Sequence, residues 1–168
     1  MMETKEIQNE LIRTGKENGM CDKFMSRLES GPLTIDQMCG LFHAGLDFCI
    51  EHNWPNLDFV KEAFDERSLA KNGIYHTGIH NSKSQKNVVT MGDALVDVYI
   101  PANGVCDIYC RHNSVVRIHA GEHAFVYVSC YDDGKVDVIE SANDAKLCAS
   151  FYSGEINNTD KFDKIHRK

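Results

Sequence analysis

The histidines are the first candidates for chemistry in this 168-residue sequence. His76 and His80 are four residues apart, a spacing that lets two histidines share a metal ion when a helix aligns them. A glycine lies between them, however, so we predict a loop there. The segment HAGEH at 119–123 is similar to a metalloprotease motif, but that motif requires H-E-x-x-H on a helix, whereas Glu122 adjoins the second histidine. We therefore predict structural histidines, no metal site and no cofactor.

The sequence does not contain the common catalytic motifs. It has no Walker loop, no dinucleotide-binding fingerprint and no nucleophile elbow. Its turns carry single Asp or Asn residues, whereas a calcium-binding β-roll needs paired glycines. The carboxylates are numerous, but their spacing pairs none of them as an acid and a base. These observations favour a protein that is not an enzyme.

The net charge indicates which partners are disfavoured, and the cysteines indicate the cellular compartment. The net charge of -7 disfavours binding to DNA or to an anionic membrane. The N-terminus lacks the apolar segment of a signal peptide, and no apolar run reaches the length of a membrane span. Seven cysteines, an odd number without the spacing of a metal knuckle, are typical of reduced thiols that pack in the core. We therefore expect a cytoplasmic protein.

The first part of the chain, residues 1–72, has the periodicity of helices and predicts a small helical bundle. Apolar residues recur three and four positions apart in four short segments. Thr34 and Asn56 precede two of these segments and predict N-caps. We expect the third helix to continue without a break to Cys49. The polar stretch 73–92, which is punctuated by Gly and Asn, is interpreted as a connector.

Residues 93–150 contain a ten-residue repeat. Each copy has Asp, Asn or His, then a small residue, and then two apolar residues separated by one position. In the first five copies the apolar positions are all even numbers, so the same side of the chain always faces inward. A two-residue hairpin between copies would reverse this facing, whereas parallel stacking of coils preserves it. The copies begin at Asp93, Asn103, Asn113, His123, Asp133 and Asp144.

The repeat predicts a short β-solenoid with two parallel strands in each coil of twenty residues. An antiparallel meander or sandwich with odd-length loops is the alternative. Asp or Asn followed by a small residue suits the tight corners that a solenoid needs. The predicted fold class is therefore α+β, a helical bundle followed by a β-solenoid. We expect the helices to cover one end of the solenoid, and the tail 151–168 to cover the other.

The odd-numbered positions of the repeat face outward and mix aromatic with charged residues. Aromatic residues and arginine are enriched where partners bind. In a coil of twenty residues, Asp97, Arg117 and Asp137 would form a ladder, which by itself could simply stabilise neighbouring strands. On the inward side Cys110 would lie above Cys130, so a redox pair is an alternative to core packing. The predicted binding residues are Tyr109, Arg117, His119, Phe125 and Tyr127.

Three segments give the chain a resemblance to other proteins. They are ELIRTGKENGMCDKFMSRL at 10–28, GLDFCIEHNWPN at 45–56 and DIYCRHNSVVRIHAGEHAFVYV at 107–128. With them the chain resembles a family of small uncharacterised proteins from gut Bacteroidetes and their prophages or mobile elements. The resemblance spans most of the length and implies a helical N-terminal half followed by ten-residue β repeats. It implies no activity and carries over no functional residue. Phe24 stands where that family often has Trp or Tyr, and Cys110 where it has Val.

Three functional hypotheses follow. The leading one is a non-enzymatic binding or assembly module, which self-associates or binds a protein partner. The second is a prophage or mobile-element factor that binds a host defence protein or a small nucleotide signal, with Arg111, His112, Arg117 and His119 as contacts for a small anionic ligand. The third is a carbohydrate-active enzyme, because parallel β-helices often host such sites, although a short solenoid offers little groove.

Overall fold

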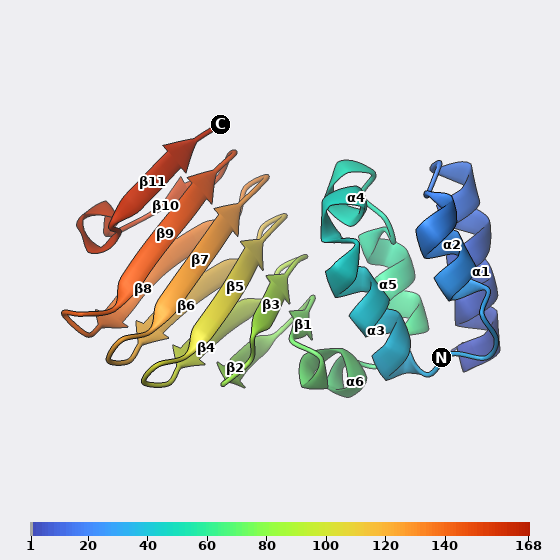
Figure 1. Ribbon diagram of the computed structural model, residues 1–168, viewed down its shortest axis with the longest axis horizontal. Helices are drawn as coiled ribbons and strands as arrows, with labels where there is room; N and C mark the ends of the chain where they lie inside the picture. Colours follow the sequence, from blue (N-terminus) through green and yellow to red (C-terminus); the bar gives the residue numbers. More distant parts are fainter. Residues whose placement is uncertain (1) are drawn as a thin grey trace. The chain divides into compact units, whose positions relative to one another are not determined.

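The structure is a computed structural model that describes residues 2–168 (Figure 1). The chain divides into two compact units, of which the first ends at Asn72 and the second extends from Gly73 to Lys168. The first unit is helical, and the second consists of parallel strands. The predicted α+β class, with helices followed by a β-solenoid, is confirmed.

The helical unit contains more helices than predicted. They are α1 (Thr4–Glu17), α2 (Asp22–Leu28), α3 (Ile35–Ala44), α4 (Leu46–Glu51), α5 (Leu57–Ala63) and α6 (Glu66–Lys71). The predicted third helix is divided at Gly45, because glycine is a weak helix former. A larger residue would not fit at this position, since the Phe24 ring lies 3.0 Å from the place of a Cβ there. The sequence did not predict α6, because six residues are too few to display a helical period.

The helix starts and the contacts between helices depend on polar side chains. Thr34 and Asn56 are N-caps, as predicted, and each accepts a hydrogen bond from the backbone N–H three residues later, at 3.2 and 2.9 Å. Gln8 on α1 donates to a backbone carbonyl at the end of α2 at 2.6 Å. Trp54 Nε1 donates to Thr14 Oγ1, also on α1, at 2.8 Å. These bonds satisfy buried polar groups while they connect segments distant in sequence.

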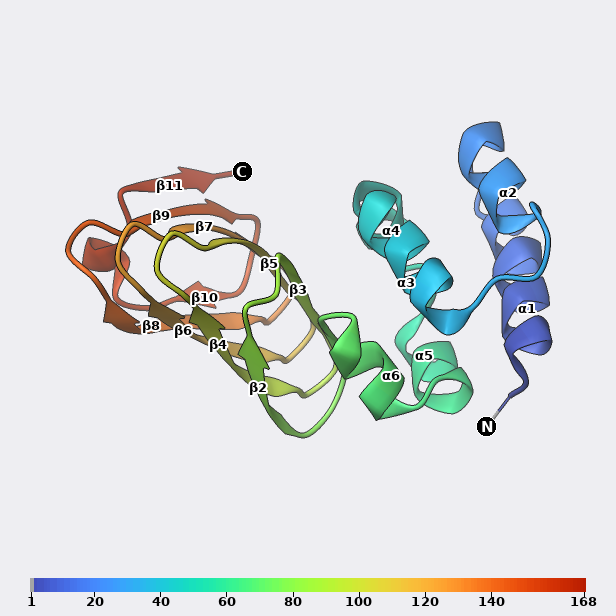
Figure 2. The same ribbon diagram turned by 60° about the horizontal axis from the view of Figure 1, so that its bottom comes forward.

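The second unit is a β-solenoid of two sheets. Its strands are β1 (Ile74–Tyr75), β2 (Ile79–Lys83), β3 (Asn87–Thr90), β4 (Leu95–Ile100), β5 (Val105–Cys110), β6 (Val115–Ala120), β7 (Phe125–Cys130), β8 (Lys135–Ser141), β9 (Lys146–Phe151), β10 (Glu155–Ile156) and β11 (Lys164–Arg167). A six-stranded sheet has the order β1-β3-β5-β7-β9-β11, and a five-stranded sheet has the order β10-β8-β6-β4-β2. Figure 2 shows the two sheets as two layers, between which the chain alternates.

Residues twenty positions apart lie side by side in the regular coils. In the five-stranded sheet Val96 pairs with Val116, and in the six-stranded sheet Cys106 pairs with Val126. The paired strands are parallel throughout residues 74–167, which excludes the antiparallel alternative. Cys106, Val116, Val126 and Val136 are each 0% exposed, so the predicted inward columns form the core between the sheets.

The solenoid is longer than the repeat indicates. Residues 73–92, interpreted above as a connector, contain β1, β2 and β3, and the tail 151–168 contains β10, a short 3-10 turn and β11. In β2 the usual pattern is inverted, because Ser82 is buried whereas Ile79 is 77% exposed. A strand of this kind gives no apolar alternation for a sequence to reveal.

One extra residue explains why the last copy of the repeat is displaced. The pairing of β6 with β8 shifts after Ile118, and His119 then pairs with Glu140, one position beyond the offset of twenty. Ile139 is therefore a bulge on the outside of β8 and is 49% exposed. The inward columns continue beyond it without interruption, since Leu147 is 0% exposed.

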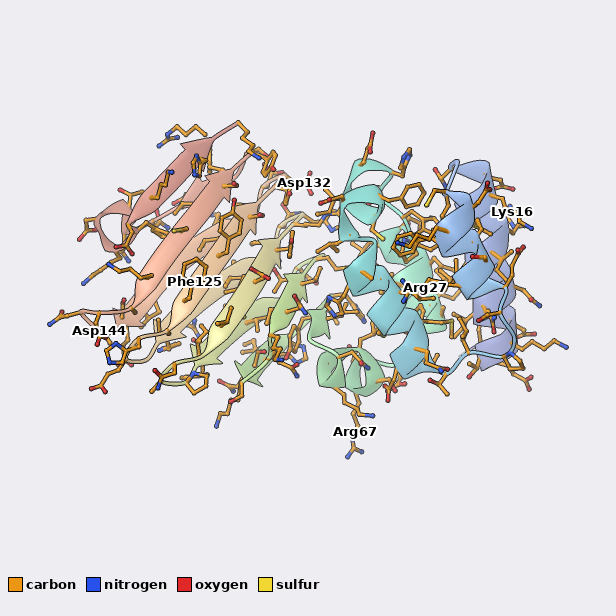
Figure 3. The ribbon with its side chains drawn as sticks, viewed as in Figure 1. Lys16, Arg27, Arg67, Phe125, Asp132 and Asp144 are labelled. Carbon is orange, nitrogen blue, oxygen red and sulfur yellow. The ribbon has the colours of Figure 1, made fainter. Side chains whose placement is uncertain are left out.

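The polar residue of each repeat lies in a corner between the sheets. Asn103 and His123 have positive φ angles of 59° and 56°; in two other corners the residue directly before the repeat position, His112 or Asp132, has a φ of 54°. Asn, Asp and His adopt this conformation more readily than most residues. The backbone N–H of His112 donates to Asp132 Oδ2 at 3.0 Å, and that of His123 donates to Asp144 Oδ1 at 3.0 Å. Asp132 and Asp144 lie at opposite ends of the strands (Figure 3), so both sets of corners have such a bond between successive coils.

Two corner glycines, Gly134 in the repeat and Gly154 in the tail, leave room for a side chain of the preceding coil. Cys110 Sγ lies 2.9 Å from the place of a Cβ on Gly134, and Cys130 Sγ lies 3.0 Å from that on Gly154. A larger residue in either corner would displace the sulfur from its close-packed position. A small residue is therefore a packing requirement in the corners at Gly134, in the repeat, and at Gly154, in the tail.

Candidate functional site

The five predicted binding residues lie on two different surfaces. Arg117 and His119 belong to β6 in the five-stranded sheet, whereas Tyr109, Phe125 and Tyr127 belong to β5 and β7 in the six-stranded sheet. Figure 3 shows Phe125 on the latter. Each step of ten residues carries the chain to the other sheet, so the outward residues of adjacent repeats point to opposite sides. The prediction from the sequence that these residues share one face is therefore wrong.

The outer face of the five-stranded sheet carries three rows of side chains that run across β2, β4, β6 and β8. We name them the apolar row (Ile79, Leu95, Val115, Lys135), the charged row (Asn81, Asp97, Arg117, Asp137) and the aromatic row (Lys83, Tyr99, His119, Glu140). The charged row contains the ladder that the sequence predicted. The three rows place apolar, charged and aromatic groups within one exposed face.

Asp97 is the centre of the contacts on this face. It is 8% exposed, and its carboxylate accepts a hydrogen bond from Arg117 Nη2 and lies 2.9 Å from His119 Nε2. The other ring nitrogen of His119, Nδ1, lies 3.6 Å from a Glu140 carboxylate oxygen. The His119 ring stacks on that of Tyr99, with centroids 4.3 Å apart. We call these five residues the Asp97 cluster; because neighbours fix its side chains, binding would cost them little further conformational entropy.

A shallow, open groove of about 640 Å³ lies beside the Asp97 cluster. Lys83 and Glu140 are among its lining residues, together with Tyr99 and His119. The Lys83 ammonium lies 5.9 Å from the centroid of the Tyr99 ring. Because β2 and β6 flank β4, Lys83 and His119 approach that ring from opposite sides. One face of the ring is therefore stacked on His119, and the Lys83 ammonium lies on the other side.

The carboxylates on the two outer faces have opposite pKa shifts. Partial burial acts to raise the pKa of Asp97, but the hydrogen bonds from Arg117 and His119 outweigh it, so this pKa is lowered. For Asp107, on the six-stranded sheet, burial raises the pKa. Asp97 is thus held in its charged form, whereas Asp107 is protonated more readily than an exposed carboxylate.

The outer face of the six-stranded sheet is arranged differently. Val105 and Phe125 are paired neighbours and are 58% and 44% exposed. The hydroxyl of Tyr127 lies 2.5 Å from Ser150 Oγ on the next strand. Tyr109 is half-buried and stands in another row. The three aromatic residues therefore lie in three different rows of this sheet.

Other residues singled out for chemistry make structural contacts. His76 is buried, and His80 Nε2 lies 2.6 Å from the carbonyl oxygen of Thr77. His123 belongs to a corner, where its Nδ1 lies 2.9 Å from a carboxylate oxygen of Asp144. Within residues 2–168, no three His, Cys, Asp or Glu side chains are arranged to hold a metal ion.

Cys110 and Cys130 lie side by side in β5 and β7, as a coil of twenty residues predicts. Both are 0% exposed. Cys110 Sγ donates to the carbonyl of Ser114 at 3.5 Å, and Cys130 Sγ donates to that of Gly134 at 3.3 Å. Both thiols are therefore packed in the core. The hydrogen bond between them lowers the pKa of Cys110 to about 7 and raises that of Cys130.

The predicted anion contacts do not converge on one place. Arg111 is buried, and His112 lies in a corner, where its Nδ1 accepts a hydrogen bond from the N–H of Gly92 at 3.1 Å. Arg117 and His119, in contrast, lie on the five-stranded sheet and contact Asp97. These four residues therefore do not build a common anion site.

The predicted binding residues include Arg117 and His119, and the predicted ladder includes Asp97, but Tyr99, Glu140 and the neighbouring Lys83 were not predicted. Asp97 and Tyr99 lie twenty positions earlier, so the coil length is a signal that finds them. Glu140 is displaced from that register by the bulge, and Lys83 belongs to the strand with the inverted pattern. Neither of these residues has a sequence signal of its own.

No protein-family model, curated protein or solved structure matches this chain. Of the helices that the structure describes in residues 2–168, none is both long enough and apolar enough to cross a membrane. What the chain binds must therefore be inferred from the chemistry of its two outer faces.

Proposed function

We propose that this chain is a non-enzymatic binding module that contacts a protein partner through the outer face of the five-stranded sheet. The observation that carries this proposal is that the apolar row and the Asp97 cluster lie beside each other on one exposed face. Ile79 in that row is 77% exposed, and Leu95 and Val115 continue it across two more strands. Exposed apolar residues next to arginine and tyrosine are typical of protein interfaces.

The Asp97 cluster would provide specificity and the apolar row would provide buried area. A partner that covers the Asp97–Arg117 pair removes its charges from water. This costs free energy unless the partner supplies complementary polar groups. The apolar row gains free energy from removal of its surface from water, whatever the partner. The seven free cysteines support a location in the reducing cytoplasm, which we keep as part of the proposal.

The test is affinity capture from native cells with two matched variants, followed by mass spectrometry. Val115→Arg places a charge in the apolar row of the five-stranded sheet, whereas Val105→Arg makes the same change at the first position of a strand in the six-stranded sheet. We expect Val115→Arg to lose a protein that the wild type and Val105→Arg both recover. Equal recovery by both variants, or loss with Val105→Arg alone, would contradict the proposal.

A small anionic ligand is a second candidate, favoured by the exposed Lys83 ammonium at the edge of the groove. Lys83 would be the anion contact in this groove, because Arg117 is engaged by Asp97. If this groove holds an anion, inorganic phosphate should raise the melting temperature of the wild type and not that of Lys83→Ala. An equal response of the two proteins would eliminate this candidate.

A further inference from the structure

We infer that the partner of the five-stranded sheet is a second copy of this chain, packed face to face around a two-fold axis that runs parallel to the strands between β4 and β6. This inference rests on the proposed function, because it names the partner for the same face. It is drawn from the order of residues within the three rows.

A two-fold axis parallel to the strands places each row opposite the same row of the other copy, read in reverse order. The strand β4 then faces β6 of the second copy, and β2 faces its β8. A row is suited to this arrangement only when its first residue complements its last and its second complements its third.

The charged row and the aromatic row both satisfy the condition. In the charged row, Asp97 faces Arg117 of the second copy, and the amide of Asn81 faces a carboxylate, that of Asp137. In the aromatic row, the Lys83 ammonium faces the Glu140 carboxylate. Because the axis is two-fold, each of these contacts occurs twice.

The remaining pairs are apolar or aromatic. Leu95 faces Val115 of the second copy, and the exposed Ile79 faces the aliphatic stem of Lys135. Tyr99 faces His119, two rings that already stack within one chain. No pair in the three rows places like charges opposite each other.

The other two-fold arrangement of the same faces does not have this property. An axis perpendicular to the strands that crosses the charged row would place Asp97 opposite Asp97 and Arg117 opposite Arg117. Like charges opposite each other in a desolvated interface strongly disfavour association. The sequence of charges along the rows therefore selects the axis parallel to the strands.

The size of the face sets the expected strength of the dimer. Four strands about 4.8 Å apart and about 20 Å long give a footprint of roughly 400 Å² on each copy. Stable interfaces of standard size bury about 800 Å² on each partner. We therefore expect a reversible dimer that forms at high protein concentration and dissociates on dilution.

The experiment reverses charges at Lys83 and Glu140, which are exposed and lie at the two ends of the aromatic row. Lys83→Glu places two carboxylates opposite each other, and Glu140→Lys places two ammonium groups opposite each other. We expect each variant alone to lose the dimer that the wild type forms in sedimentation equilibrium. An equimolar mixture of the two variants should recover it, because every contact in the mixed dimer is then complementary.

Lys164→Glu is the matched control, since it makes the same change in net charge on the outer face of β11 in the six-stranded sheet. It should dimerise like the wild type. A wild type that stays monomeric at high concentration overturns the inference, as does a mixture that fails to recover the dimer. If the wild type is monomeric while Val115→Arg still loses a cellular protein, the inference fails and the proposed function stands. If neither partner is found, both fail.

Discussion

The two sheets of the solenoid have the same inner face and different outer faces. Inside, aliphatic residues stack in columns in both sheets, and Ile108 of the six-stranded sheet and Ile118 of the five-stranded sheet are each 0% exposed. Outside, the five-stranded sheet has charges that pair across strands, whereas the six-stranded sheet has an exposed Val105 and Phe125 beside hydroxyl contacts.

The difference separates the requirements of the fold from those of binding. Stacked coils need inward aliphatic residues at every second position, irrespective of the sheet. They place no such requirement on the outward residues, which are free to differ. An arrangement that is present on one outer face and missing from the other is therefore better evidence of function than any feature of the repeat itself.

The largest expected effect comes from breaking the inner face in each sheet. Ile108→Ala and Ile118→Ala should each lower the free energy of unfolding by about 2 to 5 kcal/mol, because each leaves a cavity in a close-packed core. The losses should be alike, since the two positions are equally buried. Urea denaturation followed by circular dichroism measures both; a severe loss in only one sheet would show that the inner faces are not equivalent.

A smaller effect should separate the outer faces. Asp97→Ala leaves Arg117 and His119 without their shared carboxylate and should cost about 1 kcal/mol. The same change at Asp107, whose burial disfavours its charged form, should cost nothing measurable in urea denaturation at neutral pH. Equal losses in the two variants would remove the contrast between the faces.

Two tyrosines provide a finer comparison. Tyr127→Phe removes a hydroxyl that contacts Ser150 and should lower the free energy of unfolding by about 0.5 to 1 kcal/mol. Tyr99→Phe keeps the ring that stacks on His119 and should change stability little. Thermal melting of both variants beside the wild type measures the difference, and a larger loss for Tyr99→Phe would show that the stacked ring depends on its hydroxyl.

The last expected effect is that Asp97 and Asp107 change the stability of the fold in opposite directions as the pH falls. The pKa of Asp97 is lowered from 3.8 in the folded chain, so its stabilising contribution is present above that value and is lost as pH falls through the folded pKa. The pKa of Asp107 is raised from 3.8, so its stabilising contribution is present below that value and is lost as pH rises through the folded pKa. Relative to Asp97→Asn, the wild type should lose stability in acid; relative to Asp107→Asn, it should gain stability.

Acid denaturation monitored by tryptophan fluorescence, with urea at each pH, measures both differences. Trp54 is the only tryptophan of the chain and lies in the helical unit, so far-ultraviolet circular dichroism must follow the strands in parallel. Differences of the same sign for both variants would contradict the assignment of the two shifts.

The solenoid could be predicted from the sequence because two independent features of the repeat indicate it, the parity of the apolar positions and the small corner residues. The parity of the apolar positions fixes which side of each strand faces inward, and small residues recur at the corners, where at Gly134 the Cys110 side chain occupies the adjacent space. The helices were less visible, since Gly45 interrupts an apolar stripe that otherwise continues.

The limits of the solenoid and of the site could not be predicted in the same way. Ile79 faces outward and Ser82 inward, so β2 has the composition of a loop although it pairs with β4 throughout. The five binding residues were assigned to one face although a coil of twenty residues was predicted, because the two strands of each coil were not assigned to separate sheets. The same coil length did predict that Asp97 lies beside Arg117, and the structure confirms it.

The bulge at Ile139 has a consequence for how this solenoid can change in length. A single inserted residue was absorbed on the outside, so the columns beyond it kept their alignment. An insertion or deletion of ten residues would instead send everything after it to the opposite sheet and exchange the two surfaces. Natural variants or designed versions that keep the contact surface intact should therefore grow and shrink by whole turns of about twenty residues, with single residues tolerated only where a strand can bend away from the core.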